Sequence, residues 1–319
     1  MADPDPGPPV TGACPSCEAP VGAADSFCEA CGTELNPQLA STQPPSGRDH
    51  SELDLRLLAG VTDRGHRHVR NEDAMALATA DTPAGPVAIA VVCDGVSTSP
   101  RADDASLAAT QASIRVLLTS ARRGEDPAEA SLAAVRAAHL ALTGLGSPGD
   151  APSATYISAV IDSGAVTMCW LGDSRAYWLS AGPDPMRLST DDSLAEEMVA
   201  RGVLAEAEAL ASPQAHVITR WLGADVADPQ PHVARFEPPG PGVVLVCSDG
   251  LWNYQPDAAA LAALALPAAL TDPLGGAAAL VKFALDAGGM DNITAVLVPF
   301  PLAPFNAEPS TVPVPRLVT

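Results

Sequence analysis

The chain has few aromatic residues, a single lysine and no long apolar run, and each shortage excludes a class of protein. Aromatic residues make up 4% of the 319 residues and hydrophobic residues 47%, so we expect a globular protein with an Ala-, Val- and Leu-rich core. Lys282 is the only lysine, and the formal net charge is −21. This charge disfavours a nucleic acid or an anionic membrane surface as a partner.

A membrane-spanning segment is not expected either. The longest apolar stretch, residues 258–270, is too short to cross a bilayer and contains Pro267. Residues 1–10 are acidic and proline-rich, and they lack the basic and apolar regions of a secretory signal. We therefore expect a cytoplasmic protein with no membrane partner.

Composition divides the chain into five parts. They are an expected disordered leader at 1–13, a cysteine module at 14–35, a Pro/Ser/Gly-rich linker at 36–52, a main domain at 53–300 and a disordered tail at 301–319. Inside the main domain, strand-like and helical runs follow one another without steady βαβ alternation, which favours a layered α+β arrangement. Asp126 followed by Pro127 predicts the start of one helix.

Four of the seven cysteines form two Cys-x₂-Cys pairs: Cys14 with Cys17, and Cys28 with Cys31. This spacing predicts a zinc ribbon in which four thiolates hold one structural Zn²⁺. The segment has too few apolar residues to fold unaided, so the metal would be its core. Two disulfides are the alternative, which a reducing compartment disfavours. Residues 1–47 contain no Lys or Arg, so a protein-docking or regulatory role is favoured over nucleic-acid binding.

Three aspartates lie next to apolar runs that read as buried strands. Asp94 follows residues 87–93, Asp249 follows 243–247, and Asp291 precedes 293–298. An Asp at a strand end is a poor strand former and is costly to bury alone. The alternative is that each is a turn or capping residue. Three together predict carboxylates that converge on divalent cations, which prefer oxygen ligands.

The order of the acidic elements resembles that of the metal-dependent protein phosphatases, the type 2C serine/threonine phosphatase family. The matching segments include Asn71-Glu72-Asp73-Ala74, Asp94-Gly95, Gly172-Asp173-Ser174-Arg175, Asp191-Asp192-Ser193, Ile218-Thr219-Arg220-Trp221-Leu222-Gly223, Cys247-Ser248-Asp249-Gly250-Leu251 and Asp291-Asn292-Ile293-Thr294. One such motif means little, whereas the ordered set is specific. The resemblance implies an α+β fold: a four-layer α-β-β-α sandwich of two antiparallel sheets flanked by helix pairs. It also implies that residues 181–216 form a variable flap.

The resemblance further implies a site for two Mn²⁺ or Mg²⁺ ions. Asp94 would bridge both ions, while Gly95 and Glu72 would serve one of them. Asp249 and Asp291 would hold the other. Two such ions can hold a hydroxide nucleophile and clamp the phosphoryl oxygens. The implied reaction is the hydrolysis of phosphoserine and phosphothreonine in phosphorylated proteins, opposing a Ser/Thr kinase.

Several positions depart from the family's pattern. Asp173 would help to bind a third ion, but its usual carboxylate partner is here Asn253, a weaker ligand. His68 stands where many members carry a phosphate-binding Arg, and an imidazole donates only singly and loses its charge near neutral pH. We hypothesise that His68 or Arg67 contacts the substrate phosphate. Val96 replaces a His that some relatives carry, so a metal-bound water would protonate the leaving group.

Two other classes of function remain open. A pseudophosphatase would bind phosphoproteins and signal through the zinc ribbon; the departures favour it, whereas the intact acidic residues argue against it. A zinc-ribbon nucleic-acid binder would show salt-sensitive binding to DNA or RNA, which the negative charge disfavours.

Overall fold

The computed structural model describes residues 10–13, 19–22, 40–42, 49–146, 150–182, 185–210, 212 and 217–303. The chain forms two compact units, residues 1–39 and 40–319. In the first unit, β1 (Val10–Ala13) and β2 (Pro20–Gly22) pair antiparallel. The four cysteines of the predicted zinc ribbon, Cys14, Cys17, Cys28 and Cys31, lie outside the described residues.

The second unit contains a first six-stranded antiparallel sheet in the order β14-β10-β9-β7-β6-β3. Its strands are β3 (Ala40–Thr42), β6 (Asp73–Thr82), β7 (Gly85–Asp94), β9 (Tyr156–Ile161), β10 (Val166–Leu171) and β14 (His232–Phe236). The hairpin of β6 and β7 is the longest pairing, and its register sets Asp73 opposite Asp94. Two carboxylates therefore lie at the same end of this sheet.

A second antiparallel sheet has the order β12-β11-β15-β16-β5-β4. Its strands are β4 (His50–Asp54), β5 (Ala59–Asp63), β11 (Arg175–Leu179), β12 (Met186–Arg187), β15 (Gly242–Cys247) and β16 (Ile293–Phe300). A separate short pair joins β8 (Ser153–Ala154) to β13 (Leu222–Gly223).

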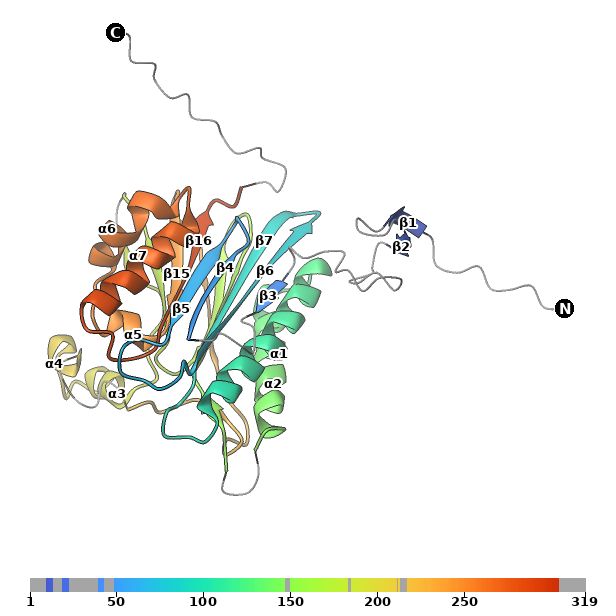
Figure 1. Ribbon diagram of the computed structural model, residues 1–319. Coiled ribbons are helices and arrows are strands. Elements are labelled where there is room, and N and C mark those ends of the chain that lie inside the picture. Colours follow the sequence, from blue (N-terminus) through green and yellow to red (C-terminus); the bar gives the residue numbers. More distant parts are fainter. Residues whose placement is uncertain are drawn as a thin grey trace, which may run out of the picture. The chain divides into compact units, whose positions relative to one another are not determined.

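Helices cover both sheets, as Figure 1 shows. The first sheet packs against α1 (Ala102–Arg122) and α2 (Pro127–Thr143), and the second against α6 (Ala258–Ala269) and α7 (Pro273–Asp286). Between the sheets lies a buried apolar core that includes Met75, Leu77, Val92, Trp178, Val244 and Val296. The prediction of two antiparallel sheets with flanking helices is confirmed.

The helix ends follow from local chemistry. Asp126 caps α2 as predicted, since its carboxylate accepts hydrogen bonds from the backbone N–H groups of Ala128 and Glu129. Asp272 caps α7 in the same way through Gly275. Within the described ranges, no helix has both the length and the apolar character that a bilayer crossing requires.

The second unit begins at Ala40, earlier than the start near Leu53 that the sequence predicts. The strand β3 and most of β4 fall within residues 36–52, which we predicted to be a linker. Both are edge strands, and Leu53 is the only buried residue of β4. A strand with one side open to water needs little apolar patterning, so composition alone did not reveal it.

The predicted flap, residues 181–216, contains α3 (Leu194–Ala200) and α4 (Glu206–Leu210). Backbone pairing closes its base: Ser193 bridges Ile218, and the Leu194 N–H donates to the Val217 carbonyl at 2.9 Å. The Ser193 hydroxyl also accepts from the Glu196 N–H and caps α3. The part of the chain between Ser193 and Ile218 therefore leaves and rejoins the domain side by side.

A buried ion pair joins Asp191, in the first part of the flap, to Arg175 of β11. Both Asp191 carboxylate oxygens accept hydrogen bonds from the Arg175 guanidinium, at 2.7–3.1 Å. The guanidinium also donates to the Tyr177 hydroxyl at 3.1 Å and stacks 3.6 Å from the centre of the Trp252 ring. The Trp252 indole donates to the Asp173 carbonyl at 2.9 Å. The ion pair, with the Trp252 ring stacked on it, therefore holds the chain in place at Asp191 and at Asp173.

We expect Asp191→Ala to lower the free energy of unfolding by about 3–5 kcal/mol, because it leaves a buried guanidinium without its carboxylate. Urea unfolding measures the change. Glu197→Ala, which removes an exposed pair with Arg201, is the control and should cost less than about 1 kcal/mol. Equal losses in the two variants would contradict the assigned role of the buried pair.

Candidate metal centre

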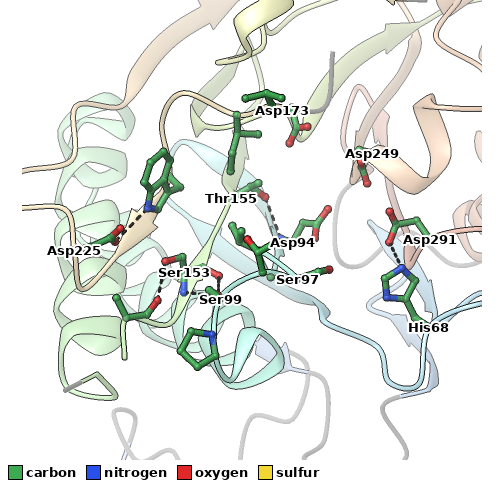
Figure 2. A pocket seen from close by; sticks show the side chains of 18 of the residues that line it. His68, Asp94, Ser97, Ser99, Ser153, Thr155, Asp173, Asp225, Asp249 and Asp291 are labelled. Carbon is green, nitrogen blue, oxygen red and sulfur yellow. Dashed lines mark hydrogen bonds and ion pairs between the residues drawn. The ribbon is translucent and has the colours of Figure 1, made fainter. Parts of the chain in front are cut away.

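The ends of three apolar strands meet at one end of the two sheets. The strand β7 ends at Asp94, β15 ends two residues before Asp249, and β16 begins two residues after Asp291. A cavity of about 1390 Å³ opens there. Its lining includes Arg67, His68, Asp94, Gly95, Val96, Asp173, Asp249, Asn253 and Asp291 (Figure 2).

Asp94 is held by its backbone. Its N–H donates to the Thr155 hydroxyl at 3.0 Å, and its carbonyl accepts from the Thr155 N–H at 2.8 Å. The Gly95 N–H donates to the Glu72 carbonyl at 3.1 Å. A Cβ at Gly95 would overlap the Ala102 carbonyl and lie 2.9 Å from the Glu72 carbonyl, so only glycine fits this turn. The close packing fixes the direction of the Asp94 side chain.

Asp249 and Asp291 lie on two loops in close contact. Asp249 is the first residue of α5 (Asp249–Trp252), and its Oδ2 accepts from Asn253 Nδ2 at 3.1 Å. A Cβ at Gly250 would overlap the Asn292 carbonyl, so the loops approach at van der Waals distance only because this residue is glycine. The pairing of β15 with β16 holds the two loops together.

Asn292 is a positioning residue that the sequence analysis missed. Its Oδ1 accepts from the Glu72 N–H at 2.7 Å, and its Nδ2 donates to the carbonyls of Arg64 and Arg70 at 2.8 and 3.1 Å. The side chain therefore holds three backbone groups of the loop that connects β5 to β6. Its place directly after Asp291 in the motif was the available signal.

Glu72 does not line the cavity with the other predicted ligands. Its side chain accepts a hydrogen bond from the Ser97 hydroxyl at 2.7 Å, and Ser97 does line the cavity. The remaining predicted Mn²⁺ or Mg²⁺ ligands all belong to the lining: Asp94, Gly95, Asp173, Asp249 and Asp291.

Asp73, which also went unassigned, joins the two sheets beneath the cavity. Its Oδ2 accepts from the hydroxyls of Ser248 and Thr294 at 2.7 and 2.6 Å. Its Oδ1 is buried and has no hydrogen-bond partner among the described residues. Burial raises the pKa of the Asp73 carboxyl to about 7, and the charges of Asp291 and Asp249 add to the rise while the two hydroxyl donors oppose it.

The other carboxylates also repel one another. Burial raises the pKa of Asp94 well above its usual range, and the charges of Asp73 and Asp249 contribute. Burial likewise raises the pKa of Asp173, with Asp249 adding to the shift. An excess of carboxylate charge around one cavity fits a cation, and an all-oxygen set of donors fits Mn²⁺ or Mg²⁺ better than a softer metal.

The carboxylates are not gathered tightly. In the part of the chain that the structure describes, no three His, Cys, Asp or Glu side chains are close enough to hold an ion by themselves. Mg²⁺ keeps several of its waters and needs only one or two carboxylates in most protein sites. The spacing therefore suits ions bound partly through water.

His68 lies at the wall of the cavity beside a predicted metal ligand. Its Nε2 is 3.1 Å from Asp291 Oδ1, and its carbonyl accepts from Arg64 Nη1 at 2.6 Å. Figure 2 shows the imidazole against the Asp291 carboxylate. Arg67 lines the same cavity and is exposed. Both residues predicted to contact phosphate are thus at the cavity.

Comparisons with known proteins agree with this geometry. Residues 62–268, more than half of the chain, match the family model described as protein phosphatase 2C. The serine/threonine phosphatase stp of Listeria innocua is 32% identical over 146 residues, which cover 45% of this chain and 55% of that protein. The chain thus spans about half the length of this curated relative.

Solved structures show the same fold. The PPM Ser-Thr phosphatase MsPP of Mycobacterium smegmatis, crystallised with cacodylate, superimposes with a TM-score of 0.61 at 28% identity, covering 76% of this chain and 97% of that one. The catalytic domain of the phosphatase PstP, in complex with two manganese ions, gives a TM-score of 0.59 at 24% identity, covering 76% and 96%. With strand-end carboxylates around one cavity and a family match over most of the sandwich, the chain belongs to the metal-dependent protein phosphatase 2C family.

Proposed function

We propose that this protein is a Mn²⁺- or Mg²⁺-dependent phosphatase of phosphoserine and phosphothreonine in proteins. The observation that supports it most is the convergence of Asp94, Asp173, Asp249 and Asp291, from both sheets, on one cavity. Membership of the phosphatase 2C family supports the same activity.

In this proposal two ions are held by the residues that the family resemblance implies. Asp94, Gly95, Glu72, Asp249 and Asp291 would hold these ions. When bound, such ions lower the pKa of water and offset the charge of the phosphoryl oxygens. Asp173 would help to hold a third ion only weakly, since Asn253 offers an amide oxygen in place of a carboxylate.

The chain's own groups orient the phosphate. Arg67 offers a guanidinium that can donate two parallel hydrogen bonds to phosphate oxygens. His68 is held at the cavity wall by Asp291, 3.1 Å from its Nε2, and its imidazole can donate one hydrogen bond to a phosphate oxygen. We assign both residues to phosphate binding, in place of the single Arg of many relatives.

Phosphorylated proteins are the proposed substrates, with a Ser/Thr kinase acting on the same proteins in a cytoplasmic setting. We also propose that Cys14, Cys17, Cys28 and Cys31 hold one structural Zn²⁺, which their spacing supports. The absence of Lys and Arg from residues 1–47 supports a role in protein docking.

The full chain should hydrolyse p-nitrophenyl phosphate when Mn²⁺ is present, and Asp249→Asn should lower kcat/KM on the order of 100-fold by weakening ion binding. Release of nitrophenolate measures the rate. Asp286→Asn, which removes an exposed carboxylate paired with Lys282, is the matched control and should retain the rate. No turnover by the parent chain between pH 6 and 9 would contradict the proposal and favour a pseudophosphatase.

His68→Ala should lower kcat/KM for p-nitrophenyl phosphate by about tenfold or more, because one hydrogen bond to the charged phosphate is lost. His68→Arg should restore the rate, since a guanidinium is always charged and supplies a second donor. Steady-state kinetics of the two variants test this. Unchanged KM and kcat in His68→Ala would remove His68 from phosphate binding.

The metal-free protein should lose stability as the pH rises from about 4 through 7. The pKa of Asp73 rises from 3.8 to about 7 on folding, so between these values the folded form keeps a proton that the unfolded chain has lost. The contribution of Asp73 to stability is therefore fully present below about pH 4 and is lost as the pH rises through about 7. Asp94 and Asp173 act in the same direction.

Melting temperatures in EDTA between pH 5 and 8 measure this effect, and saturating Mn²⁺ should remove most of the fall. Asp73→Asn should flatten the curve in EDTA, since the amide does not ionise. A melting temperature in EDTA that stays constant or rises over this range would contradict the assigned repulsion.

A further inference from the structure

The cavity extends well beyond the four carboxylates. Its lining continues onto a second region that we call the flanking lobe, formed by Ser99, Ser153, Trp221 and Asp225. Figure 2 shows Asp225 and Ser153 on one side of Asp94, and Asp291 with His68 on the other. The lobe therefore lies across Asp94 from the His68 wall.

The lobe is tied to the metal centre by backbone hydrogen bonds. The Val96 N–H donates to the Ser153 carbonyl at 2.9 Å, next to the bonds that join Asp94 to Thr155. Ser153 in β8 pairs in turn with Gly223 in β13. Trp221 precedes β13 and Asp225 follows it, so both are held at a fixed position relative to Asp94.

The size of the cavity exceeds the needs of a phosphoryl group. Its volume of about 1390 Å³ is above the range of roughly 300–1,000 Å³ that is usual for small-molecule sites. The cavity therefore has room for two parts of one substrate peptide. Its phosphorylated side chain can lie beside Asp94, and a neighbouring residue can lie in the flanking lobe.

The lobe has a negative character. Asp225 is exposed, and among the described residues that line the lobe it is the one charged side chain. Its Oδ1 accepts from the Trp221 indole at 3.2 Å, which fixes the carboxylate beside an aromatic ring. A carboxylate next to a half-buried ring is a suitable environment for a cationic side chain.

The two cationic side chains adjacent to the lobe in sequence do not neutralise Asp225. Arg101 donates to Asp104 at 3.0 Å and to the Leu145 carbonyl at 3.2 Å. Arg220 pairs with Asp192 at 3.2 Å and contacts His232 at 2.7 Å. Their guanidinium groups are thus directed to other partners.

We infer that the flanking lobe binds a Lys or Arg side chain close in sequence to the phosphorylated residue of the substrate protein. This inference rests on the proposed function and narrows its substrate class to phosphoproteins with basic residues beside the phosphosite. Asp225 supplies the ion pair, and Trp221 supplies the ring on which the cation rests. Asp225 is therefore a specificity-determining residue.

Two peptides with a non-hydrolysable phosphonate analogue of phosphoserine at the centre test the inference. One carries Arg at the two positions on either side of the analogue, and the other carries Gln there. With the full chain, Mn²⁺ and 150 mM salt, fluorescence anisotropy should show the Arg peptide binding about three- to tenfold more tightly. In Asp225→Asn this ratio should fall toward one.

Asp228→Asn is the matched control, since it removes an equal charge three residues away, from a side chain that is exposed and does not line the cavity. It should keep the preference of the parent. Equal binding of the two peptides by the parent, an unchanged ratio in Asp225→Asn, or an equal loss in both variants would overturn the inference.

The same experiment separates failure of the inference from failure of the proposed function. Binding of phosphonate peptides needs no turnover, so the ratio can be read even from a chain that does not hydrolyse p-nitrophenyl phosphate. A chain that turns over p-nitrophenyl phosphate but binds both peptides equally would retain the proposed activity and lose only the assigned preference.

Discussion

Mutual repulsion of buried carboxylates at one end of the β-sandwich is the constraint on which the rest of the site depends. Burial raises the pKa of Asp73, Asp94 and Asp173, and the charge of Asp249 raises all three further. Close packing must hold these groups in place against that repulsion. It does so through backbone contacts, such as the turn at Gly95 and the approach of Gly250 to Asn292, which leave no room for a side chain.

Neutral hydrogen-bonding groups complete the support without adding charge. Asn292 binds three backbone groups of the loop between β5 and β6, and the hydroxyls of Ser248 and Thr294 connect Asp73 of the first sheet to the second. Amides and hydroxyls can join carboxylate-bearing loops without neutralising the charge that a divalent cation would need. The structure thus separates the groups that hold the loops from those that face the cavity.

The sequence was sufficient for the sandwich and for most of the carboxylates at the cavity, because an Asp at the end of an apolar run is conspicuous and the motifs follow a specific order. It could not reveal the link from Asp73 to Ser248, which is 175 residues away in the chain. The same holds for the flanking lobe, where β8 and β13 pair over only two residues each. Such short, distant pairings leave no periodic pattern.

The segment that contains α3 and α4 is closed at its base by backbone pairing, so it can vary in evolution independently of the rest of the domain. Since Ser193 meets Ile218 and the intervening chain returns to where it left, residues between them can change in length or composition without moving either end. The buried Arg175–Asp191 pair anchors the outgoing side. The sequence and length of this segment can therefore change during evolution. Such changes alter its contacts with other proteins while the carboxylates keep their positions.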